Sequence, residues 1–298
     1  MKSYLKKIVQ GLLLGFALIS GMGGGTVAVL IGIYDELIAS IANFPKNPKK
    51  ELKVLWPWAV GMIIGIGALI VPLKLLLDRF PFITTSFVVG LTLGGFRELT
   101  SITKSHANVK NIFLAIAGIL IAASIGVISW YSNASATFIP LDFKEVILLF
   151  IIGFFASAAL VAPGISGTQF LLAIGYFSGL LQSITDIFKG VNALTNILAL
   201  GIFAIGIIIG FFVISIFMKW CLAKFRVPTY YAILGFIIGS IFACYFNGDI
   251  RSSYSNFDLI TLVLSILALT IGFAISFFTL KYASDHDPET GLAPAIKE

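Results

Sequence analysis

Two glycine-rich breaks interrupt long apolar stretches of this 298-residue sequence. The first covers residues 21–25 and is followed by Thr26, and the second begins at Pro163 and Gly164. A Gly-rich turn that opens a helix presents unpaired backbone N–H groups and the positive end of the helix dipole, and both favour anions. Glycine also lets the backbone approach a phosphate or a carboxylate closely. The two breaks therefore predict an anion site built at two helix N-termini.

The candidate site residues lie in these breaks or close to them. Those expected to bind the substrate are backbone groups, hydroxyls, an amide, two tyrosines and one arginine: Gly23, Gly24, Gly25, Thr26, Tyr34, Arg97, Gly164, Ser166, Gly167, Thr168, Gln169 and Tyr176. Further candidate cations are Lys74 and Lys219, although topology anchoring at helix ends is the favoured interpretation of both lysines.

Three carboxylates near the same segments are candidates for coupling to protons or sodium: Asp35, Glu36 and Glu98. A carboxylate at membrane depth is costly, so its presence there indicates function. The alternative is that these groups face water or pair with a lysine near the membrane surface. That alternative is favoured for Glu36, and the two interpretations are balanced for Asp35.

The composition predicts an integral membrane protein. Apolar residues make up 58% of the chain and charged residues 11%, whereas a soluble protein has about 25% charged residues. The net charge of +6 is spread over short loops, which excludes a basic nucleic-acid-binding face. The two cysteines are 23 residues apart without a CxxC motif or a neighbouring histidine, so no disulfide framework, metal site or other cofactor is predicted.

Hydropathy places both breaks inside hairpins, at about residues 8–42 and 146–188. The pieces that flank the first break are roughly 18 and 24 Å long as helices, less than the hydrocarbon core of about 30 Å, which favours re-entrant hairpins. Gly61, Gly65 and Gly201 are expected to serve close helix packing. Six full spans are predicted at about residues 54–77, 82–96, 112–131, 197–218, 230–246 and 259–282.

Self-comparison of the sequence indicates an internal duplication. A shift of 143 residues aligns the two breaks, and a shift of 145 places Phe80, Thr84 and Gly90 on Phe225, Thr229 and Gly235. The predicted units are residues 1–135 and 136–285, followed by a polar tail at 286–298. Because each unit holds one hairpin and three spans, the second must be inverted relative to the first. The expected fold is therefore all-α, with two inverted-topology repeats.

Loop charge predicts the orientation of the chain. With a cytoplasmic N-terminus, 15 of the 20 Lys and Arg residues lie inside and 5 outside, as the positive-inside rule requires. Both termini are then cytoplasmic. Trp56, Trp58 and Trp130 are expected to be interfacial anchors.

Enzymatic activity is not predicted. A lipid phosphatase needs a nucleophile, but the two histidines lie in a loop and in the polar tail, without an Arg-Pro or Ser-Gly-His motif. No Walker lysine motif is present either. Inverted hairpins also suit a channel or secondary carrier for a small anion or another small solute, which stays open as the alternative function.

The breaks resemble the paired signatures of the bacterial polyprenyl-phosphate (undecaprenyl-phosphate) transporter family. The resemblance rests on PGISGT at residues 163–168 with Gly175 and Tyr176, and on GGT at residues 24–26 with Gly32 and Tyr34. It implies translocation of undecaprenyl phosphate from the outer to the inner leaflet of the bacterial cytoplasmic membrane, which recycles the lipid carrier for cell-envelope synthesis. Membrane lipids and this lipid phosphate are then the expected partners.

One departure from the family pattern affects the first break. The family's first motif usually reads Pro-Gly-x-Ser-Gly-Gly-Thr, whereas residues 20–26 of this chain read SGMGGGT. Since the proline and the serine are missing, the first tip offers one hydroxyl fewer. This argues against an equal division of phosphate contacts between the two tips.

Overall fold

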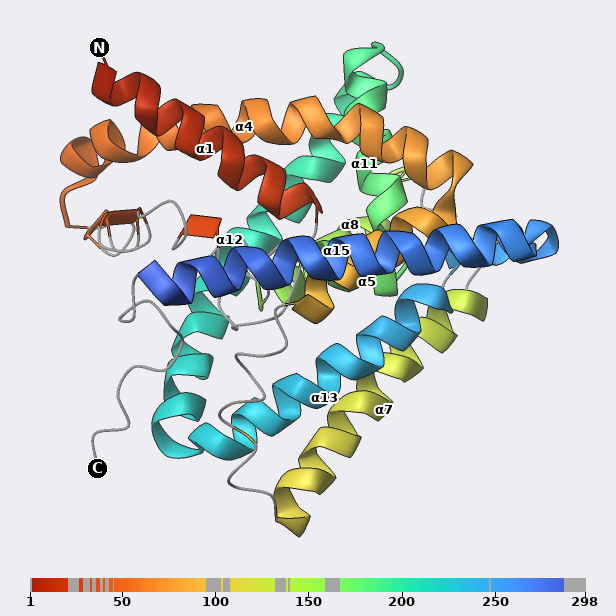
Figure 1. Ribbon diagram of the computed structural model, residues 1–298. Coiled ribbons are helices and arrows are strands. Elements are labelled where there is room, and N and C mark those ends of the chain that lie inside the picture. Colours follow the sequence, from red (N-terminus) through yellow and green to blue (C-terminus); the bar gives the residue numbers. More distant parts are fainter. Residues whose placement is uncertain are drawn as a thin grey trace.

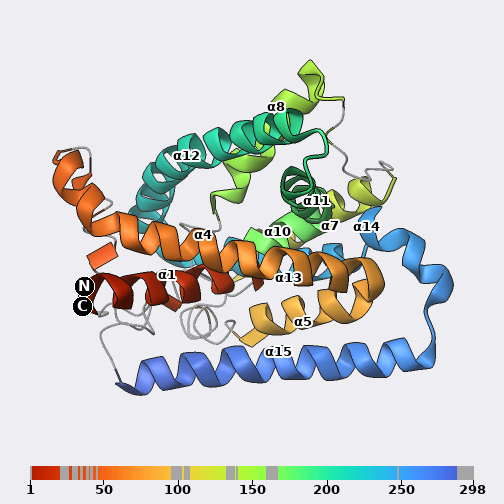
Figure 2. The ribbon, with the colours of Figure 1, turned by 90° about the horizontal axis from the view of Figure 1, so that it is seen from above.

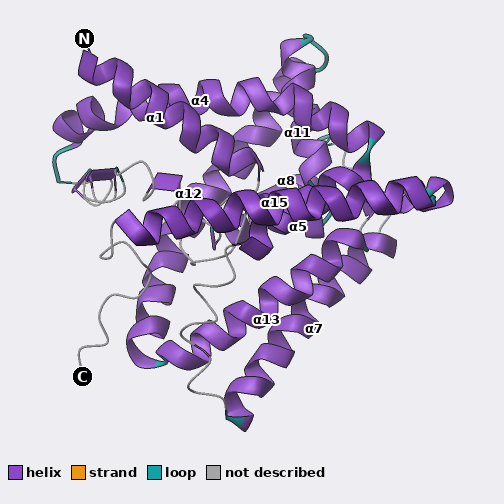
Figure 3. Cartoon of the chain, in the orientation of Figure 1, coloured by secondary structure: helices purple, strands orange, loops and turns teal. Residues whose placement is uncertain are grey.

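The fold was analysed in a computed structural model of the chain. The structure describes residues 2–20, 27–28, 33, 36–37, 40, 43–44, 46–94, 103, 108–131, 138, 140–158, 167–246 and 248–286. Within these ranges every regular element is a helix and no strand occurs (Figure 3). This confirms the predicted all-α fold.

The described helices follow one another along the chain as ten α-helices longer than one turn, one short α-helix and one 3-10 helix. Their bounds are α1 Lys2–Ser20, α4 Pro48–Arg79, α5 Pro81–Gly94, α7 Val109–Tyr131, α8 Phe143–Ala156, α10 Gly167–Ala173, α11 Phe177–Phe188, α12 Ala193–Lys224, α13 Arg226–Tyr245, α14 Gly248–Arg251, η1 Ser252–Asn256 and α15 Leu259–His286.

Five of these helices are long and apolar enough to cross a membrane: α4, α7, α12, α13 and α15. They coincide with five of the six predicted spans. The sixth, α5, is apolar but only 14 residues long in the described part of the chain. Large apolar side chains such as Ile63, Leu120 and Ile208 point outward, where a water-soluble protein would not tolerate so many. The chain is a multi-pass membrane protein.

The most extensive helix contacts form four pairs, α1 with α4, α8 with α12, α5 with α15 and α7 with α13 (Figure 2). The helices within each pair run parallel. In the first pair, for example, Gly11 packs on Trp58 and Gly15 packs on Met62. Because α1 and α4 run in the same direction, the chain must lead from the end of α1 back to the end of the molecule at which α1 begins. The same holds for the chain between α8 and α12.

This geometry places the start of α1 and the end of α15 at the same end of the molecule (Figure 1). The placement of both termini in the cytoplasm stays a prediction. The depth of each hairpin and the inverted relation of the two repeats stay predictions.

Glycines set the spacing of the pairs. An added Cβ at these glycines would overlap a carbonyl oxygen of the facing helix, so the backbones are in direct contact. The contacts of α1 with α4 recur between α8 and α12: Gly61 on Ile8 and Gly65 on Leu12 in one pair, and Gly206 on Phe150 and Gly210 on Phe154 in the other. The packing role predicted for Gly61 and Gly65 is confirmed. The same prediction for Gly201 is wrong, because nothing lies within 4 Å of an added Cβ there.

The connections from α4 to α5 and from α12 to α13 have the same local structure. Phe80 (φ −136°, ψ 58°) and Phe225 (φ −136°, ψ 49°) each join two helices with no intervening loop. The hydroxyl of Thr84 donates to the Phe80 carbonyl and that of Thr229 to the Phe225 carbonyl, at 2.9 and 2.7 Å. These residue pairs are the ones that the 145-residue shift aligns.

Helix α10 lies at the centre of the molecule. Although it has only seven residues, it contacts α1, α5, α7, α8, α11 and α13. Leu172 and Ala173 of α10 belong, with Phe177 and Leu181 of α11, to a buried core that also includes residues of α4, α5 and α13. The helix that follows the second predicted break is therefore packed against side chains from both halves of the chain.

Candidate functional site

The described residues that flank the two predicted tips meet directly. Most residues of the two tips, 21–26 and 164–166, lie outside the described residues. Four further candidates also lie outside them: Tyr34, Asp35, Arg97 and Glu98. Helix α1 ends at Ser20, just before the first tip, and α10 begins at Gly167, at the end of the second.

Thr168 joins these two helix ends. Its buried hydroxyl donates to the carbonyl oxygens of Leu18 at 2.7 Å and Ile19 at 3.3 Å. Carbonyls in the last turn of a helix have no hydrogen-bond donor within that helix. Thr168 supplies a donor to two such carbonyls at the end of α1. The contact spans about 150 residues of sequence and brings the entry to the first tip next to the exit from the second.

This contact changes the part that we assign to Thr168. The sequence suggests its hydroxyl as a donor to the substrate. In the structure, the hydroxyl proton is used by the carbonyls of α1, so Thr168 positions α10 against α1.

Gln169 fixes the first turn of α10 to α13. The side chain is 2% exposed, and its Nε2 donates to Ser240 Oγ at 3.0 Å. Ser240 Oγ donates onward to the Ile237 carbonyl at 2.9 Å, and Cys244 Sγ donates to the Gln169 carbonyl at 3.5 Å. A buried amide needs such partners, because an unpaired one costs about 1–3 kcal/mol. These contacts give the exit from the second tip a defined orientation.

The sequence analysis missed a further break, between α10 and α11. The two helices meet at 106°. The turn is made by Gly175 at φ +77°, a conformation that a side chain would strain. Ser129 Oγ of α7 donates to the Ile174 carbonyl at 3.0 Å and holds the turn. The sequence feature that could have indicated this bend is Gly175, followed by Tyr176. Hydropathy alone does not indicate a bend there, because the apolar stretch continues through it.

Tyr176 lies at the opposite end of α10 from Thr168. It is the N-cap residue of α11, and its ring stacks on Phe138 with centroids 6.0 Å apart. The structure therefore separates Tyr176 from Gly167, Thr168 and Gln169, which form the described side of the candidate site.

Glu36 belongs to a cluster at the start of α1. Its carboxylate pairs with Lys7 Nζ at 2.7 Å, and the same ammonium lies 4.3 Å from the centroid of the Trp58 ring. Trp58 Nε1 donates to Gln10 Oε1 at 3.3 Å. The interpretation of Glu36 as a lysine partner is thus the one that the geometry supports. The prediction that Trp58 is an interfacial anchor is wrong, because its side chain is 2% exposed and packs between α1 and α4.

No group of three or more His, Cys, Asp or Glu side chains suited to a metal ion occurs in the described part of the chain. Among the described residues, the polar side chains of α10 are the hydroxyl of Thr168 and the amide of Gln169.

A family described as undecaprenyl phosphate translocase-like matches residues 15–258, which is most of the chain and includes both tips. The chain belongs to this family. A polyprenyl-phosphate transporter of Staphylococcus aureus is 30% identical over 243 residues, which cover 80% of this chain and 85% of that protein. A polyprenyl-phosphate transporter of Vibrio cholerae is 27% identical over 255 residues, covering 80% and 77%.

No solved structure matches the translocase-like chain. The family membership confirms the resemblance that the tip sequences indicate.

Proposed function

We propose that the chain moves a polyprenyl phosphate, undecaprenyl phosphate in particular, from the outer to the inner leaflet of the bacterial cytoplasmic membrane. The observation that carries the proposal is the contact of Thr168 with the Leu18 and Ile19 carbonyls. It brings together the flanks of two glycine-rich segments that are far apart in the sequence. The choice of substrate is supported by the two relatives named polyprenyl-phosphate transporter, each of which aligns with 80% of this chain.

The physical problem that such a protein solves is the charge of the head group. An isolated ion in a low-dielectric medium costs tens of kcal/mol by idealised estimates, whereas the isoprenoid tail can stay in lipid. The protein therefore needs only a polar passage for the phosphate. Backbone N–H groups of residues 23–26 and 164–167, the hydroxyl of Ser166 and the guanidinium of Arg97 are the proposed donors to it.

The two tips then act as one site. Gln169 and Thr168 anchor the second tip to α13 and α1, so movement of either helix changes the position of the tip. Rocking of two inverted repeats about this point opens the site to one leaflet and then to the other. Binding and release of the phosphate need no covalent step, and the proposed activity is transport without catalysis. Asp35, Glu36 and Glu98 remain the candidates for coupling to protons or sodium, with both termini in the cytoplasm.

Reconstituted liposomes that carry labelled undecaprenyl phosphate in one leaflet test the proposal. Arg97→Ala and Ser166→Ala are expected to slow translocation by about tenfold or more, since a charge-assisted hydrogen bond is worth about 1.5–3 kcal/mol. Thr168→Ser keeps the contact with α1 and is expected to retain activity, whereas Thr168→Val loses it. Lys189→Gln, an exposed change after α11, is the control.

A folded wild-type protein that moves no lipid phosphate under any imposed ion gradient would contradict the proposal. In that case uptake of small anions by the same liposomes is the next measurement. Equal translocation rates for wild type and Arg97→Ala would contradict the role of Arg97 as a phosphate donor, but they would not contradict the proposed substrate.

A further inference from the structure

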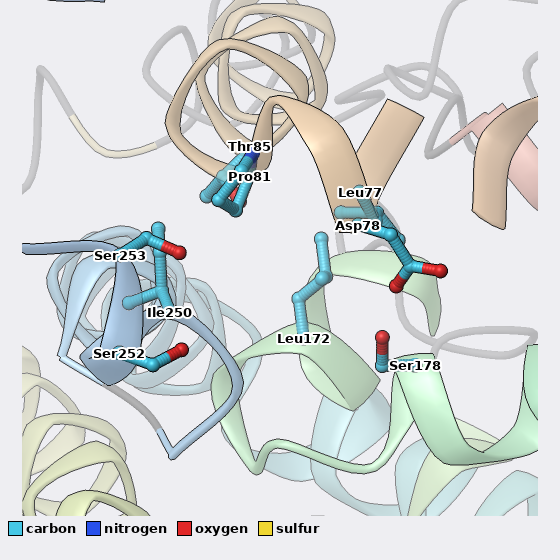
Figure 4. A pocket seen from close by; sticks show the side chains of 9 residues that line it. All are labelled: Leu77, Asp78, Pro81, Thr85, Leu172, Ser178, Ile250, Ser252 and Ser253. Atoms are coloured by element: carbon cyan, nitrogen blue, oxygen red, sulfur yellow. The ribbon is translucent and has the colours of Figure 1, made fainter. Parts of the chain in front are cut away.

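A polar cavity of about 190 Å³ lies at the end of the molecule where α4 gives way to α5. This is the end opposite the start of α1, and the loop charges predict that it faces the outside of the cell. The lining comes from α4, α5, α10, α11, α14 and η1. Figure 4 shows Asp78 and Ser178 on one side, Ile250, Ser252 and Ser253 on the other, and Leu172 between them.

Hydroxyl groups dominate the polar lining: Thr85, Ser178, Ser252 and Ser253. Thr85 is 2% exposed to solvent, and it lines the cavity from α5. Four hydroxyl-bearing side chains around one cavity can form hydrogen bonds to a single bound group. Hydroxyls donate as well as accept, which suits an oxygen-rich ligand.

One ion pair sets the charge of the cavity. Asp78 lines it, and Lys74, one helical turn earlier on α4, pairs with the Asp78 carboxylate. The Lys74 side chain is 14% exposed and that of Asp78 is 50% exposed. An ammonium has three donors, and the pair with Asp78 uses one. The carboxylate is already neutralised by a tethered cation, so a free metal ion gains little there. Lys74 does not itself line the cavity, but its ammonium lies beside the lining residue Asp78.

The wall opposite α4 is held in place. Ile250 is 2% exposed, and Arg251 donates to the Trp130 carbonyl at 3.0 Å while its guanidinium lies 5.6 Å from the Trp130 ring centroid. Tyr254 packs edge-on against Phe82 with centroids 4.8 Å apart. The connection between α13 and α15 is therefore a fixed wall of the cavity, with its serines turned inward.

The cavity also reaches the helix that carries the second tip. Leu172 lines it from α10, four residues and thus about one helical turn from Thr168. A group bound in the cavity lies on the outer side of α10, and the proposed tip site lies at the other end of the same short helix.

We propose that this outer cavity is a loading site that receives the phosphate group of a prenyl monophosphate before it reaches the tips. The inference rests on the proposed function, because it supplies the step that precedes binding at the tips. The hydroxyls of Thr85, Ser178, Ser252 and Ser253 donate to the phosphate oxygens. Lys74 shifts from Asp78 to the phosphate, whose charge of about −1.5 to −2 at pH 7 makes it the stronger partner.

The test uses a cysteine at the cavity as a reporter in the full-length protein in liposomes. Ser253→Cys is labelled with a membrane-impermeant maleimide in a Cys221→Ser background, while Cys244 is fully buried and can remain. Ser255→Cys, in the same 3-10 helix but outside the lining, is the matched control. Farnesyl phosphate, farnesol, inorganic phosphate and sodium chloride are the probes.

Farnesyl phosphate is expected to slow labelling of Ser253→Cys and not of Ser255→Cys, and farnesol is expected to protect neither. Protection by inorganic phosphate as well would assign the site to the phosphate group alone, and protection by farnesyl phosphate only would assign it to the lipid. Lys74→Gln should raise the half-protecting concentration about tenfold, the effect of losing about 1.4 kcal/mol. Asp78→Asn should lower it, because the ammonium is released, and Lys189→Gln should leave it unchanged.

Protection by sodium, or by farnesol as well as by farnesyl phosphate, would overturn the proposal. So would a weaker effect of farnesyl phosphate in Asp78→Asn, which would indicate a cation site. Translocation is measured in the same liposomes. If lipid phosphate moves but Ser253→Cys is never protected, the loading site alone fails. If Ser253→Cys is protected but no lipid moves, the proposed transport fails and the phosphate site stands.

Discussion

The α1–α4 pair and the α8–α12 pair have the same backbone contacts but different side chains between their N-terminal halves. Gly11, Gly61 and Gly65 in one pair correspond to Gly153, Gly206 and Gly210 in the other, each against a carbonyl of the facing helix. The first pair adds the polar cluster of Lys7, Gln10 and Trp58.

At the corresponding positions of the second pair stand Leu149, Ile152 and Phe203, of which Leu149 and Ile152 are buried. This difference indicates that the glycine contacts determine how the helices pack, whereas the other side chains in the helix interfaces can differ. One half has a polar cluster that holds Glu36, and the other has an apolar core in its place. The two helix pairs are thus alike in geometry and unlike in chemistry.

The largest expected effect comes from the shared glycine contacts. Gly61→Ala and Gly206→Ala each place a Cβ against a facing carbonyl, and forced separation of packed helices costs about 1–3 kcal/mol. Both variants should lower the free energy of unfolding in detergent by similar amounts. Gly67→Ala and Gly201→Ala are the matched controls on α4 and α12, because nothing lies near an added Cβ there. A loss confined to one pair would show that the two pairs are not equivalent.

The polar cluster should contribute next. Trp58→Phe installs the residue type of the second pair and removes both the Nε1 bond to Gln10 and part of the attraction to Lys7. We expect a loss of about 1–2 kcal/mol in unfolding free energy. Trp56→Phe, at an exposed tryptophan that packs on Tyr4, is the control and should change little. If both variants are equally stable, the cluster has no structural role.

The matching turns at Phe80 and Phe225 allow a finer comparison. Thr84→Val and Thr229→Val each remove one hydroxyl bond to the carbonyl of the preceding turn. Thr84 is 5% exposed, whereas the Thr229 bond is exposed. The cost should be about 0.5–1.5 kcal/mol at Thr84 and smaller at Thr229, measured as shifts in the unfolding midpoint. The reverse order would mean that burial does not control the strength of these two bonds.

The smallest effect is expected at the start of α15. Hydrogen bonds from the Thr261 hydroxyl and backbone N–H hold the pKa of Asp258 below its usual value. Since the folded-state pKa is the lower one, this cap stabilises the helix above the unfolded-state pKa of about 3.9 and is lost as pH falls through the folded-state value. The protection of the first turn of α15 against hydrogen exchange, relative to the intrinsic rate at each pH, should therefore fall at acid pH.

In Asp258→Asn, the protection of this turn against hydrogen exchange should be lower than in the wild type at neutral pH and should depend less on pH. The corresponding bond of Asp142 to the Glu145 N–H, at the start of α8, provides the comparison. Asp142→Asn should affect α8 and leave α15 unchanged. Exchange in α15 that responds to Asp142→Asn would mean that the two caps are coupled through the fold.

Much of the fold was predictable because a bilayer restricts the choices. Long apolar stretches can only be helices in lipid, so apolar helices are predictable in the parts of the chain that form α4, α7, α12, α13 and α15. The candidate site was predictable in its backbone pattern and less so in its side chains. Thr168 was recognised as important, but its bond to α1 depends on a partner about 150 residues away. The bend at Gly175 was missed because hydropathy carries no signal for a positive φ.

Composition, hydropathy and the tip motifs are local properties of the chain, so the sequence is enough to predict an all-helical membrane protein of the undecaprenyl phosphate translocase-like family. The tertiary structure decided which residues meet. It placed Trp58 inside, joined Glu36 to Lys7, and set Thr168 on the end of α1. It also enclosed a cavity with residues from six helical elements. Such contacts depend on the relative position of distant segments, which helix packing determines and a linear pattern does not contain.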